Sequence, residues 1–74
     1  MKTYLIIWFN SEGAKPSDIT ERLLSMGFQP VEGEYDYIYT WDSRAAIDDI
    51  IKFGDQVQYT LKGSGALFKF ETIS

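Results

Sequence analysis

Residues 35–41 of the chain read Tyr35-Asp36-Tyr37-Ile38-Tyr39-Thr40-Trp41. Because the side chains of a β-strand point alternately to its two faces, this segment predicts a strand that carries three tyrosines and a tryptophan in one row. Such a row forms either part of a hydrophobic core or a sheet surface that another molecule covers. The direction in which the row points is therefore the main question that the sequence raises about function.

The composition restricts the classes of protein to which the chain can belong. It has 74 residues, of which 45% are hydrophobic and 16% aromatic, with no cysteine and no histidine. This length predicts a single domain over residues 1–74, and so small a domain buries only about 60% of the surface of its unfolded chain. A disulfide framework, a thiolate metal site and a histidine base are excluded, and we expect no cofactor. We expect dense aromatic packing or self-association to supply part of the stability.

Charge and hydropathy give expectations about location and partners. No stretch reaches the roughly 18 apolar residues of a membrane-spanning helix, and the apolar run from Tyr4 to Phe9 is too short for a signal-peptide core. We therefore expect a soluble, cytoplasmic protein without a membrane partner. The 11 acidic and 7 basic residues give a net charge of −4. This charge repels a phosphate backbone on average, so we do not expect nucleic acid as a partner.

The remaining pattern predicts further strands and helices. Residues 3–10 are apolar on both faces and predict a central strand. Pro16 suits the first turn of a helix that ends at Gly27. Residues 28–32 predict a strand at the sheet edge, because Pro30 cannot donate a hydrogen bond to a neighbour. A final strand is expected over residues 66–73.

The second helix has two possible ends. Asp42 or Ser43 can cap a helix that continues to Lys62 with one apolar face. Alternatively, this helix ends near Gly54, and residues 56–62 form a fifth strand. We favour the longer helix.

The order β-α-β-β-α-β resembles the split arrangement of ferredoxin-like folds. We therefore expect an α+β fold in which a four-stranded antiparallel or mixed sheet carries two helices on one face. Strands one and three would be central. The strand with Pro30 and the strand with Lys69 and Glu71 would lie at the edges, where charge discourages unwanted pairing. The resemblance concerns topology alone, because many unrelated activities share this fold.

The aromatic row then has two possible positions. If Tyr37, Tyr39 and Trp41 point at the helices, the open face of the sheet is polar and the protein is a monomer. If they point away, they form an apolar surface that is larger than soluble monomers expose, so a partner must cover it. That surface would contain Tyr35, Tyr37, Tyr39 and Trp41, with Tyr4 and Trp8 beside them. We favour this second arrangement, because three buried tyrosine hydroxyls would need partners within a small core.

A non-enzymatic domain that forms a homodimer through this aromatic face is the function that we expect. The alternative is a module that stacks a small ligand or a single-stranded nucleic acid on the same residues. Aromatic central strands resemble the platform of RNA-recognition motifs, but Glu34 and Asp36 are acidic where that motif is basic.

Two weaker candidate sites lie in loops. The carboxylates of Glu32, Glu34 and Asp36 cluster near a hairpin and could bind a hard cation, although a solvated acidic turn explains them better. Ser11, Lys15 and Ser17 lie near a helix N-terminus, which can bind an anion, although ordinary helix capping explains them better.

The resemblance to two enzyme families of this fold ends at topology. Small acylphosphatases carry an arginine in the first loop, where this chain has only Lys15. CRISPR-associated nucleases end their first strand with a metal-binding aspartate, where this chain has Asn10. With no histidine and no visible pair of catalytic carboxylates, we do not expect an enzyme.

Overall fold

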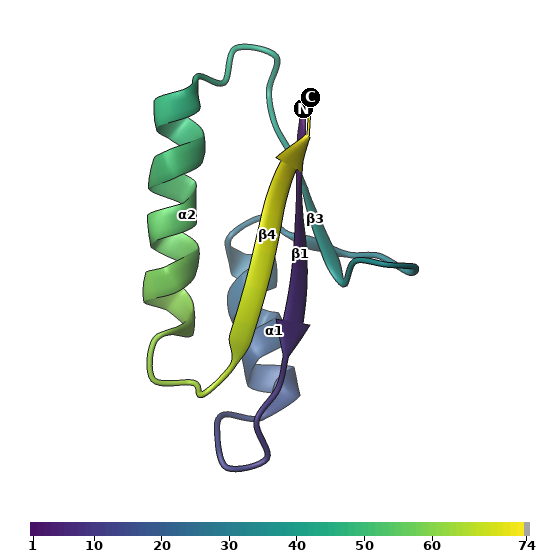
Figure 1. Cartoon of the computed structure of the whole chain (residues 1–74), viewed down its shortest axis with the longest axis vertical. Coiled ribbons are helices and arrows are strands. Elements are labelled where there is room, and N and C mark those ends of the chain that lie inside the picture. Colours follow the sequence, from purple (N-terminus) through teal and green to yellow (C-terminus); the bar gives the residue numbers. More distant parts are fainter. Residues whose placement is uncertain (74) are drawn as a thin grey trace.

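The computed structural model describes residues 1–73 and shows an α+β fold with one sheet and two helices (Figure 1). In chain order the elements are β1 (Lys2–Trp8), α1 (Pro16–Ser25), β2 (Gln29–Pro30), β3 (Tyr37–Thr40), α2 (Ile47–Leu61) and β4 (Leu67–Ile73). The predicted order of strands and helices is therefore confirmed, while the strands are shorter than expected.

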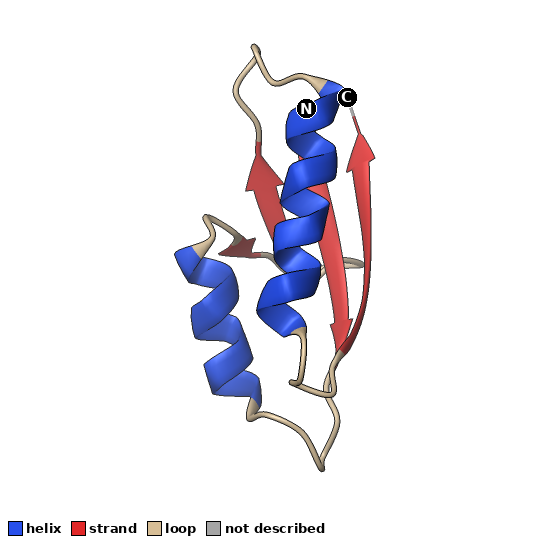
Figure 2. Ribbon diagram, turned by 90° about the vertical axis from the view of Figure 1, so that its left-hand side faces the viewer, coloured by secondary structure: helices blue, strands red, loops and turns tan. Residues whose placement is uncertain are grey.

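The four strands form an antiparallel sheet in the order β2-β3-β1-β4. This order confirms that the first and third strands are central. Along its whole length β1 pairs with β4, from Lys2 opposite Ile73 to Trp8 opposite Leu67. Figure 2 shows β4 along one outer edge of the sheet. The other edge strand is the very short β2, which contains Pro30 as the sequence predicted.

Both helices lie on the same side of the sheet (Figures 1 and 2), and the core fills the space between them and the strands. Apolar residues of α2 recur every four positions, so Phe53, Val57 and Leu61 share the buried face. The other members of the core are Leu5, Ile7, Ile19, Leu23, Phe28 and Tyr37.

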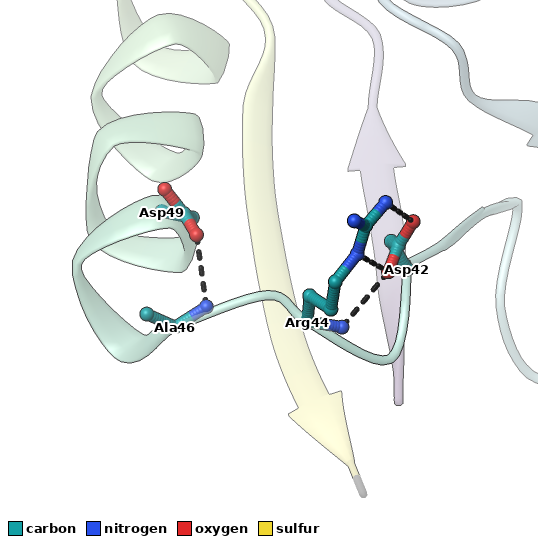
Figure 3. Close-up of polar contacts among 4 residues, drawn as sticks. All are labelled: Asp42, Arg44, Ala46 and Asp49. Carbon is teal, nitrogen blue, oxygen red and sulfur yellow. Dashed lines mark hydrogen bonds and ion pairs between the residues drawn. The ribbon is translucent and has the colours of Figure 1, made fainter.

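The second helix begins at Ile47, so the predicted start at Ser43 is wrong. Asp42 instead closes a turn, because its side chain accepts a hydrogen bond from the Arg44 backbone N–H at 2.8 Å (Figure 3). This N–H and the Arg44 guanidinium lower the pKa of the Asp42 carboxyl. Ala46 precedes the helix, and Asp49 in the first turn reaches back to it, because its Oδ2 accepts from the Ala46 N–H at 2.8 Å.

The helix continues through Gly54 to Leu61, which excludes the predicted alternative of a strand over residues 56–62. Gly54 has a packing role within the helix. A Cβ atom at this position would lie 2.7 Å from Cζ of Phe70 on β4. The missing side chain therefore lets the Phe70 ring pack against the helix backbone, which explains a glycine that also resembled a helix end.

Candidate functional site

The aromatic row is divided between the two sides of the sheet. Tyr37 is only 6% exposed and belongs to the core. Tyr39 and Trp41 pack against Phe53 of α2, with ring centroids 4.3 and 5.1 Å away. These three residues point at the helices, so the expectation that they lie on the open face is wrong.

The pairing of β3 with β1 determines this direction. Directly opposite residues of an antiparallel pair point to the same face. Tyr37 lies opposite Leu5 and Tyr39 lies opposite Thr3, and both of these β1 residues are buried against the helices.

The buried Tyr37 hydroxyl and the Trp41 indole N–H each have a threonine partner, so the core can hold these two polar groups. The hydroxyls of Tyr37 and Thr20 lie 2.7 Å apart, and Nε1 of Trp41 donates to Oγ1 of Thr3 at 2.7 Å. The Thr3 hydroxyl in turn lies 2.7 Å from that of Thr72. Within residues 1–73, every buried side-chain nitrogen and oxygen has a hydrogen-bond partner.

Tyr35 lies on the opposite side of the sheet from the rest of the row. Its ring stacks on Tyr4 with centroids 4.6 Å apart, and its hydroxyl donates to Oε2 of Glu71 at 3.2 Å. Figure 1 shows the segment between β2 and β3 extending away from the helices. Reduced solvation, followed by the negative charges of Glu71 and Glu34, raises the pKa of the Tyr35 hydroxyl.

A bend at Asp36 causes the change of side. Its N–H donates to the carbonyl of Leu5 at 2.9 Å, and its Oδ2 accepts from the N–H of Ile7 at 2.9 Å. The Asp36 carboxylate therefore accepts a β1 hydrogen bond at a position that lies before the first residue of β3. The predicted cation ligands Glu32 and Glu34 are exposed, and residues 1–73 contain no cluster of three or more potential metal ligands.

The helix-free side of the sheet, which we call the open sheet face, is largely apolar. Thr3, Leu5 and Ile7 of β1 are buried against the helices, so the residues that alternate with them point to the open sheet face. Trp8 and Leu67 lie opposite each other in the β1–β4 register and expose 53% and 71% of their surface. The apolar members of this face are Tyr4, Ile6, Trp8, Tyr35, Ile38, Leu67 and Ile73.

A shallow hollow adjoins the Trp8 end of the open sheet face. It measures about 490 Å³ and is lined by Trp8, Phe9, Asn10, Ser11, Gly65 and Leu67. A contact between loops supports its wall, because the Ala14 N–H donates to the Ser64 carbonyl at 2.9 Å. The Ser64 side chain is buried and donates to the Leu61 carbonyl at 2.6 Å.

The predicted anion site is divided between two places. Ser11 lines the hollow beside Trp8. Lys15 precedes α1 and Ser17 lies in its first turn, where both are exposed. Asp18 in the same turn adds a negative charge, which opposes anion binding at this helix end.

No protein-family model, curated protein or solved structure matches the chain. Neither of the helices in residues 1–73 has the length and apolar character needed to cross a membrane.

Sequence reasoning placed Tyr4 and Trp8 on the open sheet face but missed Leu67 and Ile73. Residues that alternate with Phe68 and Phe70 must share the face opposite to those rings. The same alternation that assigns Lys69 to the open side therefore also identifies these two apolar residues.

Proposed function

We propose that the protein is a non-catalytic domain of ferredoxin-like topology that associates with itself through the open sheet face. The observation that carries this proposal is the pair Trp8 and Leu67, which lie side by side on the helix-free side of the sheet and face solvent. An exposed tryptophan beside an exposed leucine is typical of an interaction site, because burial of large aromatic residues dominates association energies.

A second copy of the chain fits this face better than a nucleic acid does. The face carries both signs of charge, since Lys2 on β1 and Lys69 and Glu71 on β4 point to the same side of the sheet. A copy rotated about a two-fold axis can bring these opposite charges together. A nucleic acid would instead meet a chain with a net charge of −4.

The test is the solution mass of a variant that keeps the fold and removes the apolar contact. In Trp8→Glu the indole is replaced by a charge on a position that is already 53% exposed. We expect the mass measured by light scattering to fall by half at equal concentration, with an unchanged far-UV circular dichroism spectrum. The matched control is Tyr59→Glu, at an aromatic residue of α2 that is 80% exposed.

Tryptophan fluorescence of the unmodified protein gives a second measurement. Trp41 is packed against the core, so a red shift of the emission on dilution would report the exposure of Trp8. If Trp8→Glu keeps the mass of the unmodified protein, association through the open sheet face is wrong.

A second candidate function is the binding of a small planar ligand in the hollow of about 490 Å³ beside Trp8. Exposed Phe9 and Trp8 offer apolar walls, and Asn10 and Ser11 offer polar groups. Titration with 8-anilinonaphthalene-1-sulfonate and with a dT oligonucleotide tests it. Binding that Trp8→Glu abolishes, in a protein whose mass does not change, would favour this function.

A further inference from the structure

The outer edge of β4 carries a sequence that is complementary to itself. When two copies of this strand are placed antiparallel with Phe70 opposite the partner's Phe70, Lys69 lies opposite the partner's Glu71. The same register places Leu67 opposite the partner's Ile73. Both charges are available for such pairing, since the Lys69 and Glu71 side chains are 63% and 41% exposed. Opposite charges across an antiparallel pair are stabilising.

The neighbouring registers are unfavourable. A register centred on Lys69 places two ammonium groups opposite each other, and one centred on Glu71 places two carboxylates opposite each other. Like charges at directly opposite positions are destabilising. The charges that protect this edge from unspecific pairing thus select the register centred on Phe70.

The backbone of β1 shows which groups of β4 are free to pair. Consecutive residues of a strand direct their N–H and C=O groups to opposite sides. The Leu5 carbonyl and the Ile7 N–H both bond to Asp36, so these residues use their backbone groups on the β3 side. Tyr4 and Ile6 therefore direct theirs towards β4.

The residues of β4 opposite this pair are Glu71 and Lys69, whose backbone groups point back to β1. Phe68, Phe70 and Thr72 consequently direct their N–H and C=O groups to the outer edge. In the register centred on Phe70, these three residues lie opposite the same three residues of the partner. The register that pairs the charges therefore also pairs the outward backbone groups.

The helix side of the same edge has an apolar groove for the partner. The groove, about 330 Å³, lies between α2 and β4, and its lining includes Ile50, Ile51, Phe68 and Phe70. Ile51 is 59% exposed. Because Gly54 lies against the Phe70 ring, the middle of α2 is next to the position of the two-fold axis. Pairing through β4 would bring the partner's α2 against this groove and cover it.

We propose that two copies of the chain pair antiparallel through their β4 edges, with Phe70 at the two-fold axis, and form a continuous eight-stranded sheet. This contact uses the sheet edge and stands whether or not the open sheet face associates. If both contacts form, the assembly has four copies with two kinds of two-fold interface.

The test uses charge reversal in a Trp8→Glu background, so that only the edge contact is measured. We expect this parent protein to be a dimer. Lys69→Glu places carboxylates opposite carboxylates, and Glu71→Lys places ammonium groups opposite ammonium groups. Each change should raise the dimer dissociation constant, measured by sedimentation equilibrium, by about tenfold or more.

Mixing the two variants distinguishes the edge contact from an effect within one chain. Each variant also loses the internal Lys69–Glu71 ion pair of 3.5 Å, which mixing cannot restore. In a mixed pair, however, two carboxylates of one protomer lie opposite two ammonium groups of the other. We therefore expect an equimolar mixture to dimerise at least as tightly as the parent.

The matched control is Glu21→Lys on the exposed surface of α1, which changes the net charge as Glu71→Lys does and should leave the dissociation constant unchanged. A Trp8→Glu protein that is already monomeric would overturn the proposal, as would a mixture that stays monomeric. Failure of the open-face proposal gives a different result, namely a Trp8→Glu protein with the mass of the unmodified chain.

Discussion

The contact between Gly54 and Phe70 predicts that Gly54→Ala destabilises the protein when Phe70 is present and stabilises it when Phe70 is replaced by a smaller residue. Alanine is favoured over glycine inside a helix by about 1 kcal/mol, so Gly54→Ala in an unobstructed helix would be stabilising. Here the new Cβ would lie 2.7 Å from the Phe70 ring. Overpacking of this kind costs about 1–3 kcal/mol, so we expect Gly54→Ala to lower the free energy of unfolding by about 1 kcal/mol.

Gly54→Ala should be stabilising once Phe70 is replaced by a smaller side chain. In a Phe70→Leu background the atom that would clash is gone, and we expect Gly54→Ala to raise the free energy of unfolding by up to about 1 kcal/mol. The coupling energy of this double-mutant cycle should therefore exceed about 1 kcal/mol. Urea denaturation followed by circular dichroism at low protein concentration measures it. Equal effects of Gly54→Ala in both backgrounds would refute the packing role of Gly54.

Two further outcomes can be checked by denaturation. Asp49→Ala removes the hydrogen bond to the Ala46 N–H at the start of α2 and should lower the free energy of unfolding by about 1 kcal/mol. The control Asp48→Ala should have a smaller effect. An equal loss of stability in both variants would refute the role of the Asp49 hydrogen bond. The pKa of Tyr35 is raised above 10.0, so the folded state holds this proton more tightly than the unfolded state does. The protonated Tyr35 hydroxyl therefore stabilises the folded state fully at a pH below its pKa in the unfolded chain. This stabilisation is lost as the pH rises through its pKa in the folded protein. We therefore expect the free energy of unfolding of Tyr35→Phe to fall less than that of the unmodified protein as the pH rises above 10.0. The same pH dependence of unfolding in both proteins would contradict this.

Much of the architecture could be predicted from the sequence because it depends on local patterns. The apolar residues of β1 on both faces indicated a central strand, and Pro30 indicated an edge. The four-residue period of α2 indicated a long helix. Each of these patterns lies within the element that it predicts, so no contact with a distant residue is needed to recognise it.

The start of α2 could not be predicted because two capping residues compete. Asp42 suits the position before a helix and Asp49 suits the third position within one, so two different starts are compatible with the sequence. In the structure Asp42 binds the Arg44 N–H and closes a turn, while Asp49 accepts from the Ala46 N–H at the start of α2.

The sequence by itself determined the order of the elements, the edge position of β4 and the alternation that separates Trp8 from Leu5 and Ile7. Only the tertiary structure decided the direction of the aromatic row. That direction depends on the pairing of Tyr37 with Leu5, and on a hydroxyl partner from Thr20 on another element. Such contacts join residues far apart in the chain, so the strength of each depends on the packing of the whole domain.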